Sequence, residues 1–176
     1  ADEIILNNAY LNINYTKGDF AAGLRYESYL NALMDFDDNY KGNGIPFRYA
    51  AYSIDGLDVT VGNYYEQVGS GLIFRSYENK GLGADNAMDG IRLKYSPLKG
   101  VYLKSFIGKS RTYFTYAEGI IRGADGEINV NEALNIKSKT RIIIGQGLVS
   151  RFQKAGAEIN PKFKLPQNVA AYSSRL

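Results

Sequence analysis

The side chains best suited to contact a solute are gathered in one glycine-punctuated stretch, residues 57–95. They are Tyr65, Glu66, Gln67, Arg75 and Arg92. Together they offer an aromatic face, hydrogen-bond donors and acceptors, and both signs of charge, which are the groups that line selective pores and ligand sites. One interpretation is that residues 65–88 fold into the lumen of a barrel as a constriction or plug. The alternative is a bulged strand whose tyrosines lie at an interface and whose Glu66 pairs with a luminal arginine.

A first group of oxygen-bearing side chains that could bind a hard cation is formed by Asp85, Asn86 and Asp89. Calcium takes oxygen ligands of this kind. The same side chains also cap turns, because they accept hydrogen bonds from nearby backbone N–H groups. The position of the group just before an alternating segment favours turn capping.

A second candidate cation site lies in GADGEINVNE, residues 123–132. Asp125 and Glu132 match the second half of a calcium-loop motif. The first carboxylate positions of that motif fall on an isoleucine and a glycine, so too few ligands remain. We therefore predict a polar loop here and assign no metal site.

The acidic residues of this region are also the only group that could support hydrolysis. They are Glu118, Asp125, Glu127 and Glu132. A glycosidase needs two carboxylates facing one sugar across roughly 5–10 Å, and the spacing along the chain does not establish such a pair. The chain has no histidine and no cysteine, which excludes a histidine-based triad, a thiol nucleophile and a cysteine-based metal site. We expect no enzyme activity and no cofactor.

The elements that position these residues are predicted to be β-strands. Tyr (15 residues) and Gly (19 residues) are abundant, and apolar residues alternate with polar ones along much of the chain. The expected strands occupy residues 9–15, 20–30, 47–54, 57–62, 91–95, 101–107, 139–149 and 167–175, about eight in all. The four prolines lie outside their interiors, where a missing N–H does no harm.

Alternation of this kind fits both a soluble sandwich and a membrane barrel. The strands have about the length needed to cross a bilayer at a tilt. The polar face carries paired charges, Arg25, Glu27, Asp58, Arg92, Lys94 and Lys104. Tyrosines gather near strand ends, as in an interfacial girdle. These features favour an antiparallel up-and-down transmembrane β-barrel, while a soluble or surface-exposed β-sandwich that binds glycan or protein through its tyrosines stays open.

The lengths of the connections indicate that the barrel extends beyond this chain. Short turns are expected at 16–19, 54–57 and 96–100, and long connections at 32–46, 67–88 and 115–138. Outer-membrane barrels have short periplasmic turns and long external loops, so the first strand would have to start outside. We therefore expect residues 1–176 to form a single barrel domain that is incomplete at both ends.

Several ordered motifs resemble an uncharacterised family of porin-like outer-membrane β-barrels from Bacteroidota. They are NNAYLNINY, FAAGLRYESYL, YKGNGIPFRYA, VGNYYEQVGSGLIFRSYE, LGADNAMDGIRLKY, YAEGIIRGADGEINVNE and LPQNVAAYSSR. The resemblance covers nearly the whole chain, which would correspond to the N-terminal part of the family. It implies a fold and a location but no substrate, reaction or catalytic residue.

We accordingly expect a protein of the bacterial outer membrane that passes solutes as porins do, or that serves as the barrel subunit of an envelope complex. Its expected partners are the lipid bilayer, lipopolysaccharide and other envelope proteins. The net charge of +3 comes from dispersed lysines and arginines. Because no basic cluster tracks a nucleic-acid backbone, no nucleic-acid partner is expected.

Overall fold

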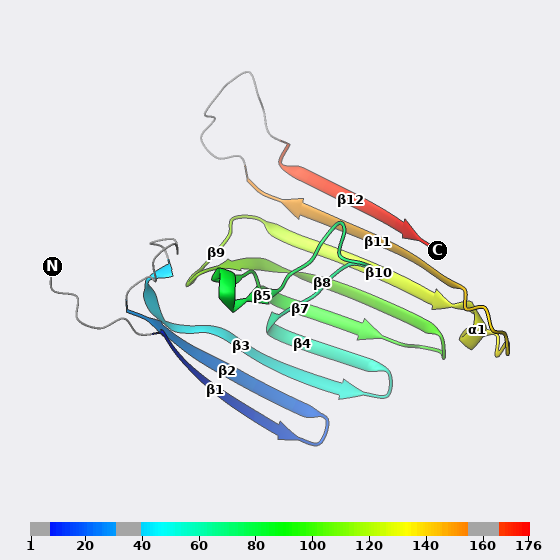
Figure 1. Cartoon of the computed structure of the whole chain (residues 1–176), viewed down its shortest axis with the longest axis horizontal. Helices are drawn as coiled ribbons and strands as arrows, with labels where there is room; N and C mark the ends of the chain where they lie inside the picture. Colours follow the sequence, from blue (N-terminus) through cyan, green and yellow to red (C-terminus); the bar gives the residue numbers. More distant parts are fainter. Residues whose placement is uncertain (1–7, 31–39, 155–165) are drawn as a thin grey trace.

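A single antiparallel sheet accounts for most of the computed structural model, which describes residues 8–30, 40–154 and 166–176 (Figure 1). The long strands are β1 (Asn8–Lys17), β2 (Phe20–Tyr29), β3 (Gly42–Ile54), β4 (Leu57–Tyr64), β7 (Met88–Tyr95), β8 (Val101–Thr112), β10 (Ile120–Asn129), β11 (Ile143–Phe152) and β12 (Asn168–Arg175). The short elements are β5 (Glu78–Asn79), η2 (Lys80–Leu82), β6 (Ala84–Asp85), β9 (Thr115–Tyr116) and α1 (Val130–Ala133). Each long strand pairs with the next one along the chain, so the sheet is an up-and-down meander.

The predicted all-β, antiparallel fold is confirmed. The described sheet is open, with β1 and β12 at its two edges, and no closed barrel is seen (Figure 1). No helix in these parts of the chain is long and apolar enough to cross a membrane.

The prediction of a long connection at 115–138 is wrong, because β10 lies within it. Gly123, Asp125, Gly126 and Glu127 have low strand propensity, so the sequence of this segment favours a loop. Their tertiary partners outweigh that propensity, since β10 pairs with both β8 and β11. The described residues therefore contain nine long strands rather than about eight.

One face of the sheet is apolar and remains exposed; we call it the apolar face. Leu11, Val61, Ile91, Ile107 and Leu148 lie on it, on five different strands, and each is between 41 and 56% exposed. Side chains alternate between the two faces of a strand, so each residue beside one of these points to the opposite side.

The opposite face, which we call the charged face, is the buried one. It carries the residues predicted for it, including Arg25, Glu27 and Arg92, and residues 65–87 lie across it (Figure 1). Glu27 is 1% exposed. In a soluble protein, a sheet buries its apolar face and exposes its polar face. This sheet has the reverse arrangement.

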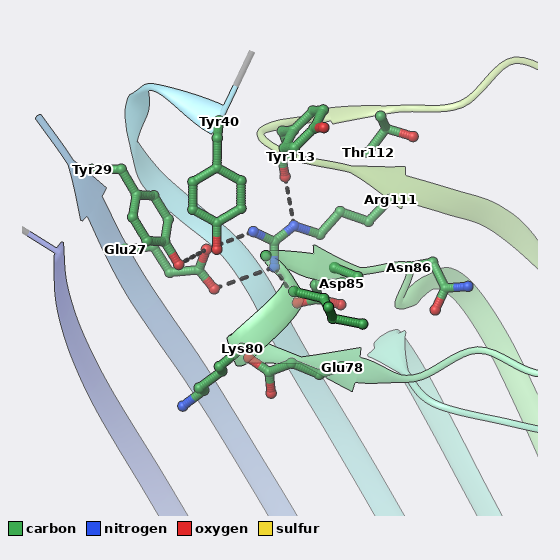
Figure 2. A pocket seen from close by; sticks show the side chains of 13 residues that line it. Glu27, Tyr29, Tyr40, Glu78, Lys80, Asp85, Asn86, Arg111, Thr112 and Tyr113 are labelled. Carbon is green, nitrogen blue, oxygen red and sulfur yellow. Dashed lines mark hydrogen bonds and ion pairs between the residues drawn. The ribbon is translucent and has the colours of Figure 1, made fainter. Parts of the chain in front are cut away.

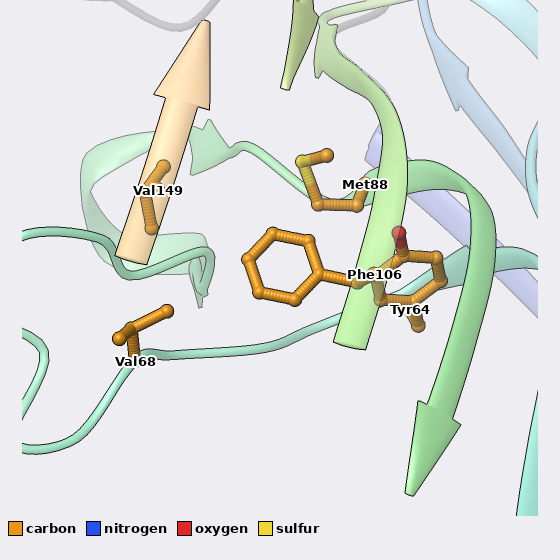
Figure 3. Packing of buried hydrophobic residues seen from close by; sticks show 5 residues of the cluster. All are labelled: Tyr64, Val68, Met88, Phe106 and Val149. Carbon is orange, nitrogen blue, oxygen red and sulfur yellow. The ribbon is translucent and has the colours of Figure 1, made fainter. Parts of the chain in front are cut away.

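A small apolar cluster attaches residues 65–87 to the middle of the charged face. Figure 3 shows Val68 pointing toward Phe106 of β8 and Val149 of β11, with Tyr64 and Met88 beside them. Val68 is 1% exposed and Met88 is fully buried. The contact fixes the segment against strands that follow it in the sequence.

Glycines opposite aromatic residues allow the strands to approach closely on the charged face. Phe106 is in register with Gly123, and a Cβ atom at Gly123 would lie 2.2 Å from Phe106 Cζ. Tyr49 is in register with Gly23, where a Cβ atom would lie 2.5 Å from Tyr49 Cε1. In both pairs the ring occupies the space of the missing side chain.

The connections differ between the two edges of the sheet. At one edge, the short-turn edge, the strands are joined by residues 18–19, 55–56, 96–100 and 130–142. At the other, the long-loop edge, they are joined by residues 30–41, 65–87, 113–119 and 153–167. The expected alternation of short and long connections holds for the first two pairs and weakens after β8.

Candidate functional site

Residues 65–87 and the charged face beneath them form the candidate site. The segment leaves β4, bonds to itself between Gln67 and Arg75, and returns through β5, η2 and β6 to β7. Glycines at 69 and 71 adopt positive φ, which allows the chain to reverse there. The segment is thus a folded covering held against the sheet.

Glu66 anchors the first part of the segment through three cations of the charged face. Its Oε1 atom lies 2.9 Å from Lys104 Nζ, and its Oε2 atom lies 3.4 Å from Lys94 Nζ and 3.9 Å from Arg92 Nη1. Glu66 is 7% exposed. A carboxylate in this position is stabilised by the surrounding positive charge, and its removal would leave the three cations facing one another.

Arg92 connects this anchor to the strands. Its guanidinium donates to Asp58 Oδ1 at 3.3 Å, to Thr60 Oγ1 at 2.9 Å and to the Tyr65 carbonyl at 3.4 Å. Asp58 and Thr60 both lie on β4, so Arg92 joins β7 to its neighbour and to the segment.

A second network holds the end of the segment near the long-loop edge. Figure 2 shows Arg111 between Glu27 and Asp85. Its Nη2 atom lies 2.5 Å from Glu27 Oε2, and its Nη1 atom lies 2.5 Å from Asp85 Oδ2. Arg25 contacts the same two carboxylates at 2.6 Å each and Glu78 at 3.0 Å. Three carboxylates therefore surround two guanidiniums.

A cavity of about 310 Å³ opens beside this network (Figure 2). Its lining residues are Glu27, Tyr29, Tyr40, Glu78, Lys80, Leu82, Gly83, Ala84, Asp85, Asn86, Arg111, Thr112 and Tyr113. Lys80 Nζ lies 4.5 Å from the centre of the Tyr10 ring, at the exposed side. Hydroxyl, carboxylate and ammonium groups around a small volume are suited to hydrogen bonding with a polar solute.

Two tyrosines near the cavity remain neutral over the physiological pH range. Tyr65 donates to Asp85 Oδ1 at 3.0 Å and stacks on Phe47 at 5.5 Å, and burial raises the pKa of its phenol. Burial also raises the pKa of Tyr40 to about 12. Both phenols thus keep the proton that they can donate.

The structure brings together only some of the predicted site residues. Tyr65, Glu66 and Arg92 meet beneath the segment, where Glu66 pairs with cations of the charged face. Gln67 and Arg75 lie on the exposed side, with the Arg75 guanidinium 5.4 Å from the Tyr77 ring.

The four weak metal candidates lie apart, and each has a basic partner. Asp85 pairs with Arg25 and Arg111, Asp89 with Arg48, Asp125 with Arg175, and Glu132 with Arg141. Among residues 8–30, 40–154 and 166–176, no group of three or more His, Cys, Asp or Glu side chains is placed to hold a metal ion. Asp85 accepts from the backbone N–H group of Ala87, two residues on, as a turn-capping side chain does, whereas Asn86 accepts from the more distant N–H group of Tyr77.

Sequence reasoning missed Arg111 and Glu78 as members of the site. Arg111 is the last residue but one of β8, and its backbone N–H donates to the Ala87 carbonyl, so strand alternation is not a guide to its side chain there. Glu78 lies in the segment, where no periodic pattern exists. The one signal in the sequence that could have indicated Arg111 and Glu78 is the balance between the charges of the sheet and those of the segment.

Fold and site together define an all-β protein with an antiparallel sheet whose charged face is covered by a segment of its own chain. The chain belongs to a family of unknown function, DUF6029, whose model matches residues 1–176. No curated protein and no solved structure matches the chain significantly.

Proposed function

We propose that this protein forms part of a β-barrel in a bacterial outer membrane and that the barrel passes small polar solutes. The observation that carries the proposal is the reversed burial of the sheet: large apolar side chains are exposed on one face in strand after strand, and charged side chains such as Arg25, Glu27 and Arg111 are buried on the other. Lipid is the surroundings in which an exposed apolar sheet face is stable. No catalytic step forms part of the proposal.

The dimensions of the sheet support a bilayer as the occupant of the apolar face. Strands of 8–13 residues match the roughly 9–11 residues that cross a membrane at a tilt. Tyr15, Phe20, Tyr52 and Tyr95 lie on the apolar face close to the short-turn edge, and each is at least 40% exposed. A row of aromatic side chains at one edge is typical of a membrane interface.

The proposal includes closure of the sheet through additional strands. The described residues contain nine long strands with two unpaired edges, whereas barrels of bacterial outer membranes close with an even number. A Bacteroidota origin, which the motifs indicate, and assembly with other envelope proteins belong to the same proposal.

Passage would follow the charged face, narrowed by residues 65–87. Glu66 and Arg92 hold the segment in place, while Gln67 and Arg75 face away from the sheet toward the enclosed space. A solute would then meet Arg75 and Tyr77 on the exposed side of the segment, and the cavity beside Lys80 near the long-loop edge.

Spin labels test the orientation of the sheet directly, because the chain has no cysteine and every introduced cysteine is unique. The labels would be placed singly at Val59 and Val61 on the apolar face and at Asp58 and Thr60 on the charged face, and the protein reconstituted in lipid vesicles. We expect high collision rates with oxygen at the first pair and low rates at the second. Equal rates at all four positions would contradict the proposal.

A membrane fractionation distinguishes the alternative sandwich. A sandwich that binds glycan or protein would leave membranes in high salt or chelator without detergent. An integral barrel would stay with the membrane under both treatments.

A further inference from the structure

Near the long-loop edge, the apolar face carries two cations whose side chains have no partner among the described residues. Lys109 of β8 and Arg122 of β10 are exposed, and neither side chain takes part in a hydrogen bond or ion pair within the described parts of the chain. Lys109 alternates with Ile107, and Arg122 alternates with Ala124, so both share the side of the exposed apolar residues. Unpaired charge on a face otherwise suited to lipid requires an explanation.

The two side chains are neighbours. Arg122 is in register with Ile107, two residues from Lys109 along β8. Diagonal positions of this kind on one face of adjacent antiparallel strands are roughly 7–8 Å apart at Cα, within reach of long side chains. One ligand can therefore contact both cations.

The anionic groups around the pair are already engaged. Asp89 is in register with Lys109, but its carboxylate accepts from the Arg48 guanidinium at 3.4 Å. Arg48 also donates to the Tyr116 hydroxyl at 3.2 Å. Glu118, on the connection to β10, accepts from Gln153 at 3.4 Å. The pair thus keeps two positive charges without a nearby free carboxylate.

The height of the pair on the sheet sets its place in a membrane. Lys109 and Arg122 lie toward the long-loop edge, beyond the apolar positions Leu103 and Ile107 of β8. Long loops of outer-membrane barrels face the outside. In the proposed barrel, the pair is then level with the headgroups of the outer leaflet.

We propose that Lys109 and Arg122 bind a phosphate group of a lipid of the outer leaflet, and specifically a phosphate monoester such as lipid A of lipopolysaccharide carries. The inference rests on the proposed membrane location. A phosphate monoester carries close to two negative charges at neutral pH, which matches two unpaired cations, whereas the diester of a phospholipid carries one. The side chains of arginine and lysine carry hydrogen-bond donors and no acceptors, so both can donate to phosphate oxygens.

Native mass spectrometry of the full chain in detergent micelles, titrated with lipid A, tests the site. The double variant Lys109→Ser, Arg122→Ser should bind lipid A about 25-fold more weakly, because each basic residue near a membrane surface contributes about fivefold. The matched control is Lys17→Ser. Lys17 lies on the same face at the short-turn edge, and its loss should leave lipid A binding unchanged.

Two further lipid titrations identify which lipid supplies the phosphate group. Dephosphorylated lipid A should bind the wild type as weakly as lipid A binds the double variant. Phosphatidylglycerol should bind more weakly than lipid A, and equal affinity for the two would overturn the assignment to a monoester.

The same samples separate this inference from the proposed function. If the double variant keeps the alternating spin-label pattern in vesicles and binds lipid A as the wild type does, the site is wrong and the membrane location stands. If the wild type shows no alternating pattern, the membrane location fails and the lipid site fails with it.

Discussion

At the scale of single residues, the charged face depends on compensated buried charges. Glu27 lies between Arg25 and Arg111, which are 7% and 5% exposed. Burial of an ion pair adds little stability in itself, but removal of one partner leaves an uncompensated charge. The network is therefore sensitive to the loss of any single member.

We expect Glu27→Ala to lower the free energy of unfolding by about 3–5 kcal/mol, because Arg25 and Arg111 would each lose a buried ion-pair partner. Urea unfolding in detergent micelles, followed by tyrosine fluorescence, measures the change. Glu118→Ala is the control, since that carboxylate is exposed and makes only a long contact with Gln153. A loss as small as that of the control would show that the network contributes nothing to stability.

The raised pKa of Tyr40 gives a pH dependence at the alkaline end. The folded state keeps the phenol protonated up to a pKa of about 12, whereas the unfolded chain ionises near its ordinary value of about 10. Below the ordinary pKa, the contribution of Tyr40 to stability is complete, and it is lost as the pH rises from that value to the folded one. Melting temperatures at pH 9 and pH 11.5 should fall less for Tyr40→Phe than for the wild type, and an equal fall would exclude this role.

At the scale of elements, the glycine and aromatic pairs hold neighbouring strands together. Gly123→Ala places a methyl group into the ring of Phe106 and should cost about 1–3 kcal/mol through overpacking. Gly126→Ala, three residues along β10, is the matched control, because the nearest atom is Leu103 Cδ2 at an ordinary 3.5 Å. Chemical unfolding of both variants checks the difference, and equal midpoints would contradict the interpretation.

The sequence was sufficient for most strands and insufficient for β10. Strict alternation, as in Leu57 to Val61 or Ile91 to Tyr95, predicted both the strands and the exposed apolar face. β10 mixes Gly123, Gly126 and four polar residues, so its strand structure depends on pairing with β8 and β11 rather than on its own composition.

The candidate site was predictable only in part for the same reason. Tyr65, Glu66 and Arg92 stood out by residue type, but their partners come from strands far along the chain, such as Lys104 of β8. The long-range pairing of Arg111 with Glu27 has no local signal. Side chains at strand ends and in aperiodic segments leave no periodic trace from which their direction could be inferred.

At the scale of the whole molecule, the charge facing the enclosed space should determine ion selectivity. Arg75→Ser removes an exposed cation from the segment, and Arg92→Ser releases Asp58, so both should shift the reversal potential toward cation preference. Planar-bilayer recordings under a salt gradient measure the shift. Lys139→Ser, in the connection between β10 and β11, should not change the potential. Unchanged potentials in both arginine variants would count against a luminal position.

Direct pairing of β4 with β7 makes the covering segment a closed tether. Tyr64 and Met88 are register partners, so the two ends of residues 65–87 are adjacent in the sheet whether or not the segment is docked. The pairing of β4 with β7 already offsets the entropic cost of closing that loop. Docking of the segment is therefore intramolecular. Its effective concentration at the charged face is in the millimolar range or above, which a free peptide would have to match. A displaced segment would stay attached to β4 and β7 at its two ends and would return to the same cations. The strands beneath it would stay paired meanwhile.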